Sequence, residues 1–147
     1  MDARQLFLTN NSILQSRLQK ICSDPTDEQV RFAHEAVDDR GLSNVVIHLY
    51  GSVMNRARAI LGQEREPAPE LPQTTAELMT FINESHVKAE GLIGQITDAQ
   101  LEAVVKLPFA ELPGATAMLD SYAHAFRHVG NVLDARHLGG FETHALG

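Results

Sequence analysis

Residues 115–138 read ATAMLDSYAHAFRHVGNVLDARHL, and this stretch decides the fold class. Apolar residues recur in it every three or four positions, which is the period of an amphipathic α-helix. Pro113 and Gly114 break the chain before the stretch, and Gly139 and Gly140 end it. The pattern therefore predicts one long helix over 115–138.

The same helical period recurs in three earlier segments. The first segment ends at Asp24 and Pro25, because proline disfavours a helical conformation in the residue before it. The second begins at Ser43 or Asn44, either of which is a favourable N-cap, and stops at Gly62. The predicted helices cover residues 3–22, 43–61 and 74–96.

Two long connections and a short helix join these segments. Residues 25–41 are polar and charged and are predicted as a connector. Residues 63–73 hold three of the six prolines and are predicted as an extended linker, long enough to cross the molecule. Thr97 and Gln100 form a capping-box pattern, which predicts a short helix over 98–105.

These elements predict an all-α fold: a four-helix bundle with long crossover connections and a short extra helix before the last long helix. The 147 residues, 44% of them hydrophobic, are enough to enclose one core, so we expect a single domain over 1–147. No segment predicts a strand strongly, although residues 104–109 could be extended.

Charge and cysteine content exclude several classes of protein. The formal net charge is -7, and no run of Lys or Arg could neutralise a row of phosphates, so we expect neither a nucleic acid nor a membrane as partner. Cys22 is the single cysteine and is expected to be a small buried side chain. Residues 1–20 lack the continuous apolar core of a secretory signal. We therefore expect a cytoplasmic protein.

Three histidines lie on the second face of their predicted helices, because each residue turns a helix by about 100°. His124 and His128 are nearly opposite the apolar stripe of the last helix, and His48 is opposite that of the helix over 43–61. Small and polar neighbours favour a roomy pocket over a solvated face. On the last helix, the predicted stripe is Leu119, Tyr122, Phe126, Val129 and Leu133, and the histidine face also holds Ala117, Ser121, Asn131 and Ala135. On the helix over 43–61, the predicted stripe is Leu42, Val45, Leu49, Val53 and Ile60, and the histidine face also holds Asn44, Gly51, Ser52, Asn55 and Ala59.

This arrangement suits a divalent metal ion. Neutral imidazole is the commonest nitrogen ligand of such ions, and histidines at i and i+4 share one helix face. His48 from a second helix would complete a three-histidine site whose remaining positions stay open to water or substrate. Ligand type alone leaves Zn, Ni, Fe and Mn open.

The alternative is that the spacing arises by chance, because a chain with seven histidines produces such pairs without function. The other four histidines are predicted as surface or loop residues, and His34 stays a candidate because its connector could cover the pocket. They are His34, His86, His137 and His144.

Three short motifs resemble the DinB/YfiT-like superfamily of metal-dependent enzymes. They are NVVIH at 44–48, LIGQITDAQL at 92–101, and HAFRHVGNV at 124–132, which is similar to the signature H-x-x-x-H-x-G-[Q/E]-[I/L/V]. The order of the three histidines along the chain also agrees. Asn131 departs from the signature, which commonly has Gln or Glu at this position.

The resemblance implies a four-helix bundle with a three-histidine metal site, frequently in a homodimer. Some members of the superfamily are similar to S-transferases or isomerases that use a low-molecular-weight thiol, such as bacillithiol or mycothiol. We therefore expect a metal-dependent hydrolase or thiol-dependent transferase that acts on a small molecule. The alternative is a non-catalytic metal- or ligand-binding stress-response module on the same bundle.

Residues beside the three histidines are candidates to bind substrate or to orient the ligands. Arg127 or Asn131 would orient an anionic substrate or a metal ligand. No general base is assigned, and Asp120 is a candidate only because it lies one turn before His124. The remaining pocket candidates are Asn44, Ser52 and Asn55.

Overall fold

A computed structural model describes residues 2–38 and 40–140 of the protein. The described part is mostly helical, so the all-α prediction is confirmed, with one small two-stranded sheet added. The predicted tail 141–147, with His144, lies outside the described residues. The elements are α1 (Ala3–Cys22), α2 (Asp27–Val30), α3 (Leu42–Leu61), α4 (Thr75–Gln95), α5 (Asp98–Glu102), β1 (Val104–Lys106), β2 (Glu111–Pro113) and α6 (Gly114–Leu138).

The start of α3 differs from the prediction. Its N-cap is Gly41 and no side chain caps it, so the expectation of Ser43 or Asn44 as N-cap is wrong. The backbone N–H of Leu42 instead donates to the carbonyl of Phe32 at 3.2 Å, because the connector folds back against the helix start. A Cβ at Gly41 would lie 2.6 Å from that carbonyl oxygen. At the other end, Gly62 has a left-handed conformation, which confirms the predicted stop.

The prediction of the short helix α5 is confirmed at its start and wrong at its end. Thr97 and Gln100 form both hydrogen bonds of the capping box. The helix was predicted to cover 98–105 but ends at Glu102. The chain then forms β1, which pairs antiparallel with β2 so that Val104 lies opposite Pro113. β-branched valines favour an extended backbone, and pairing with β2 gives them hydrogen-bond partners.

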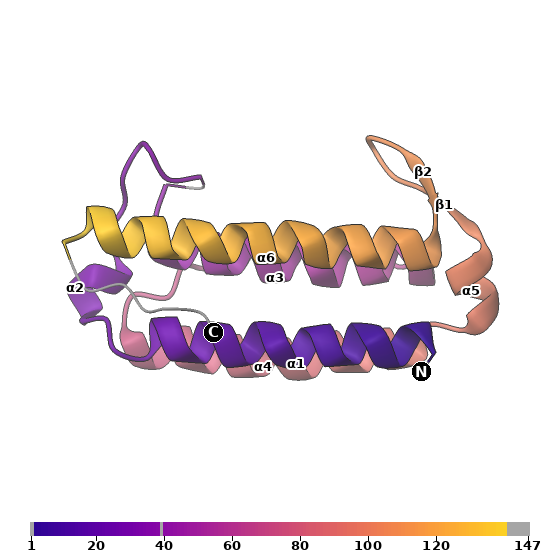
Figure 1. Cartoon of the computed structure of the whole chain (residues 1–147), viewed down its shortest axis with the longest axis horizontal. Coiled ribbons are helices and arrows are strands. Elements are labelled where there is room, and N and C mark those ends of the chain that lie inside the picture. The colour runs from indigo at the N-terminus through magenta and orange to yellow at the C-terminus, as the bar shows by residue number, and fades with distance from the viewer. Residues whose placement is uncertain (1, 39, 141–147) are drawn as a thin grey trace.

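The four long helices pack in a closed ring: α1 on α4, α4 on α3, α3 on α6, and α6 on α1. Figure 1 shows α1 and α6 starting at the same end of the molecule, next to α5 and the β1–β2 hairpin, and α2 at the opposite end. Residues 62–74 link α3 to α4. The side chain of Arg58 pairs with Glu66 of this linker at 3.1 Å, so the linker turns back along α3.

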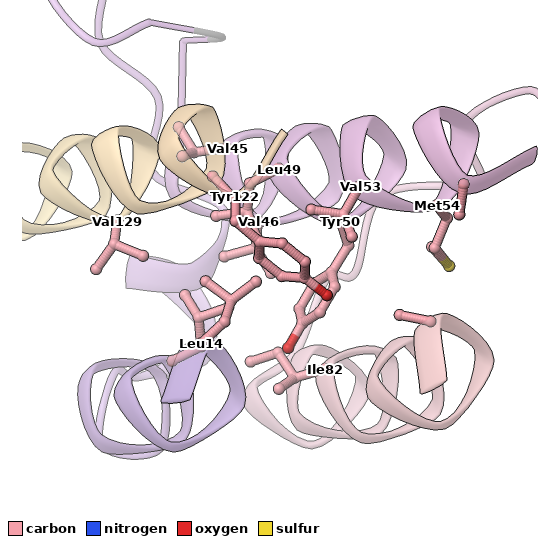
Figure 2. Close-up of a cluster of buried hydrophobic side chains, with 14 of the residues drawn as sticks. Leu14, Val45, Val46, Leu49, Tyr50, Val53, Met54, Ile82, Tyr122 and Val129 are labelled. Atoms are coloured by element: carbon pink, nitrogen blue, oxygen red, sulfur yellow. The ribbon is translucent and has the colours of Figure 1, made fainter. Parts of the chain in front are cut away.

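The interior is built from the inner faces of all four long helices. Figure 2 shows the rings of Tyr50 and Tyr122 in this interior, near Leu14 of α1 and Ile82 of α4. All five residues of the predicted apolar stripe on α3 are buried, as expected. Within the described residues, no helix is sufficiently long and apolar to cross a membrane.

The predicted apolar stripe on α6 is partly wrong. Leu119 is 53% exposed, whereas Ala117, Ser121 and Ala135, which were assigned to the histidine face, are buried. The reason is that α6 packs on α1 and on α3 at once, so two of its faces are covered. Small side chains line the face toward α3, where they allow the two helices to approach closely.

Candidate metal centre

Three histidine side chains from two helices converge between α3 and α6. The Nε2 atom of His124 lies 3.3 Å from Nε2 of His48 and 3.1 Å from Nε2 of His128. One ligand atom from each of the three rings lies within 4.8 Å of the other two. The structure thus brings together the predicted ligand set.

The spacing of these atoms fits a metal ion. Nitrogen ligands about 2.0–2.1 Å from a tetrahedral zinc ion are about 3.3 Å from one another. The distances of 3.1 and 3.3 Å around His124 agree with this value. The rings meet edge to face, with centroids 4.4 to 5.0 Å apart, and the short distances between their Nε2 atoms bring the nitrogen atoms together.

Burial and nearby positive charge keep His124 neutral. His128 is buried, and His48 and His124 are half-buried. Desolvation, as the largest cause, together with the neighbouring histidines and with Arg127 and Arg56, lowers the pKa of His124 from 6.5 to about 4. At neutral pH this ring is therefore unprotonated and has a lone pair for a cation.

Cavities lie on both sides of the histidines. One, of about 270 Å³, reaches His48 and is bounded by α3, α4 and the linker. The other, of about 460 Å³, reaches His124 and is bounded by α3, α6 and the turn between β1 and β2. Ser52 lines both. The space beside the candidate ligands is sufficient for a small molecule.

Two of the predicted pocket residues lie at the cavities. Ser52 lines them directly, and Asn55 lines the cavity next to the linker. The side-chain oxygen of Asn55 accepts hydrogen bonds from the Arg58 side chain at 3.0 Å and from the backbone N–H of Glu66 at 3.1 Å. Asn55 therefore holds the linker in place as the wall of the cavity.

The other predicted residues differ in their distance from the cluster. Arg127 is close, with Nη2 3.5 Å from Nε2 of His128. Asn44 is half-buried one turn before His48. The side-chain amide of Asn131 donates to Asp134 at 3.5 Å, one turn further along α6, which gives it a local contact in place of a contact to a candidate ligand.

Arg56 is a site residue that the sequence analysis missed. Its Nη1 donates to the backbone carbonyl of Ala117 at 2.9 Å and to the Asp120 carboxylate at 3.0 Å. Its guanidinium carbon lies 5.1 Å from the centre of the Phe109 ring, a cation–π contact. A signal was available, because Arg56 follows His48 and Ser52 at intervals of four residues and so shares their helix face.

The remaining histidines lie elsewhere. His34 is exposed and accepts a hydrogen bond from the backbone N–H of Ala36, and it is not among the residues that line the two cavities. His137 is exposed, as predicted. The expectation of a surface position for His86 is wrong, because its side chain is 12% exposed and hydrogen-bonded to Asn11 of α1. The close packing of α1 on α4 covers it.

Cys22 is buried, as predicted. Burial raises the pKa of its thiol to about 12, an effect that the nearby positive charge of Arg136 only partly offsets. A thiol in this state is a poor nucleophile at neutral pH. Chemistry at the histidine cluster therefore has no thiolate from Cys22 to use.

Comparisons with protein families and with curated proteins give no match. No protein-family model matches the sequence, and no curated protein is significantly similar to it.

Proposed function

We propose that the protein binds a divalent metal ion through His48, His124 and His128 and acts as a metal-dependent enzyme of the DinB/YfiT-like type. The convergence of three imidazole nitrogens within 4.8 Å of one another is the observation that carries the proposal. In this proposal the ring of four long helices is the superfamily's four-helix bundle, and the linker over 62–74 is one of its long crossover connections.

The donor set suits catalysis. Three histidine ligands leave one or more positions of the metal free, which is the arrangement that distinguishes catalytic from structural zinc sites. A bound ion would supply Lewis acidity and lower the pKa of a coordinated water or thiol. Zn, Ni, Fe and Mn all accept imidazole ligands, so the choice among them is left to experiment.

The reaction class follows from the groups at hand. Cys22 is buried with a raised pKa, so the chain supplies no cysteine nucleophile at the site. In this proposal the nucleophile is water, in a hydrolase, or the thiol of a small cosubstrate, in an S-transferase or isomerase. The two cavities beside the histidines provide room for a small-molecule substrate.

A non-catalytic metal- or ligand-binding module is the second candidate, and one contact favours it. Asp120, the positional candidate for a general base, accepts a hydrogen bond and ion pair from Arg56 at 3.0 Å. This contact turns the Asp120 carboxylate toward Arg56.

Metal content tests the shared premise of both functions. Wild-type protein purified without chelator should contain one divalent ion per chain, and the ion should raise the melting temperature until a chelator removes it. His124→Ala should lose the ion and the thermal shift while keeping its helical circular dichroism. His137→Ala, an exposed histidine on the same helix, is the matched control and should behave as wild type.

An outcome in which wild type binds none of Zn, Ni, Fe(II) or Mn would overturn the metal site. Turnover then separates the two functions. The metal-loaded protein is incubated with a thiol and an electrophile, or with an ester substrate. An enzyme should give product that His124→Ala does not, whereas a binding module gives none.

We also propose that the protein is a homodimer, as the resemblance implies. Sedimentation equilibrium on wild-type protein should give twice the chain mass. A single-chain mass across micromolar concentrations would contradict this part of the proposal without affecting the metal site.

A further inference from the structure

The guanidinium of Arg127 lies unusually close to the candidate metal ligands. Its Nη2 is 3.5 Å from Nε2 of His128, one of the three converging nitrogen atoms. Across residues 2–38 and 40–140, Arg127 forms no ion pair with a carboxylate. Asp120, the acidic residue that lines the same cavity, is bonded to Arg56 instead.

This closeness creates an electrostatic conflict once a cation binds. Three neutral histidines bring no negative charge, so a divalent ion would keep its full charge of +2 in the site. Two positive charges a few ångströms apart repel one another, although water around the exposed Arg127 weakens the effect. A negative charge at the guanidinium would relieve this repulsion.

The cavity beside His124 has space for such an anion. Its volume is about 460 Å³, and its charged side chains are Arg56, Arg127 and Asp120. Arg56 and Asp120 neutralise each other, which leaves one positive charge in excess. The cavity on the other side also has one positive charge in excess, because Arg58, Arg65 and Lys88 outnumber Glu66 and Glu84, but Arg127 is not among the residues that line it.

The chemistry of the arginine identifies the anion. A planar guanidinium donates two parallel hydrogen bonds to a carboxylate, and one guanidinium matches the single negative charge of that group. We propose that the substrate carries a carboxylate, which binds to Arg127 in the cavity beside His124. This inference rests on the proposed metal site and specifies the class of molecule that the site accepts.

Acetate binding to cobalt-loaded protein tests the inference. Cobalt(II) replaces the native ion, and its visible absorption reports a change at the metal when acetate is added. Arg127→Gln should bind one cobalt ion per chain at least as tightly as wild type, because it removes a positive charge, and should weaken acetate binding by about tenfold or more, the loss expected for a charge-assisted bidentate contact. The acetate affinity of Arg127→Lys should lie between those of wild type and Arg127→Gln, because lysine keeps the positive charge but cannot donate two parallel hydrogen bonds.

Arg31→Gln is the control for a general change of charge, because Arg31 is exposed and bonds to the linker carbonyl of Gln73 away from the cluster. It should bind acetate as wild type does. Equal acetate affinity in wild type and Arg127→Gln, both loaded with cobalt, would overturn this inference alone. Failure of wild type to bind cobalt or any of Zn, Ni, Fe(II) and Mn would overturn the metal site and the inference together. Inorganic phosphate that binds more tightly than acetate through Arg127 would overturn the carboxylate assignment.

Discussion

Arg136 holds the carboxylate of Asp24 with two hydrogen bonds, of 2.8 Å from Nη1 and 3.1 Å from Nη2, although 112 residues separate them in the chain. Nη1 also donates to the backbone carbonyl of Ile21 at 2.9 Å. The Arg136 side chain is 1% exposed. One arginine near the end of α6 thus fixes the end of α1 and the start of the connector that follows it.

Arg136→Met should lower the free energy of unfolding by about 2–4 kcal/mol, because it strips partners from a buried carbonyl and a half-exposed carboxylate. Urea titration at pH 7 measures the change. Arg31→Met removes an exposed arginine and should change stability by less than about 1 kcal/mol. An equal loss of unfolding free energy in the two variants would show that the buried contacts of Arg136 do not contribute to stability.

Two glycines of α6 should respond to alanine with opposite signs. A Cβ at Gly114 would lie 2.3 Å from the backbone oxygen of Gln100, so Gly114→Ala must displace α5 and should cost about 1–3 kcal/mol. No atom lies within 4 Å of a Cβ at Gly130. Gly130→Ala should therefore stabilise metal-free protein by up to about 1 kcal/mol through helix propensity. Thermal unfolding of both variants should show a lower melting temperature for Gly114→Ala and a higher one for Gly130→Ala.

The thiol of Cys22 should be unreactive in the folded protein. Its pKa is raised to about 12 by burial, so almost no thiolate exists at pH 8, and the side chain is inaccessible. Ellman's reagent should label less than about one tenth of the thiol in native buffer over minutes and all of it in denaturant. Rapid labelling of the native protein would contradict the buried position.

Acid should destabilise the metal-free protein through His124. The folded-state pKa of about 4 lies below the unfolded value of 6.5, so the unfolded chain binds more protons between these values. The stability contribution is complete above about pH 6.5 and is lost as the pH falls toward 4. Urea titrations at pH 7, 6 and 5 should show a smaller decline for His124→Gln than for wild type. His137→Gln should decline as wild type does.

Local sequence patterns predicted the helices well where local interactions decide them. The helix over 3–22 agrees with α1 at both ends, Gly62 stops α3, and Thr97 with Gln100 starts α5. Each of these signals acts within a few residues through a cap, a left-handed glycine or a proline. The convergence of the three histidines was predicted for a similar reason, because helix faces follow from residue number.

Features that depend on distant contacts were missed. The start of α3 depends on the connector carbonyl of Phe32. The sequence allowed an extended conformation over 104–109, which holds for β1 (Val104–Lys106), but the pairing of β1 with β2 was not predicted. The role of Arg56 required knowledge that α3 packs on α6, since its partners are the carbonyl of Ala117 and the carboxylate of Asp120. Helical periodicity alone gives no information about which neighbour covers which face.

The linker over 62–74 contributes no ligand, yet it builds one wall of the cavity at His48 through Arg65, Glu66, Pro67, Ala68 and Pro69. The candidate metal ligands lie on helices, while this wall lies on an extended segment held by Asn55 and Arg58. Mutations that lengthen or reshape the segment can change which molecules the cavity admits without moving the three histidines. The three histidines and the wall of the cavity can thus change independently during evolution.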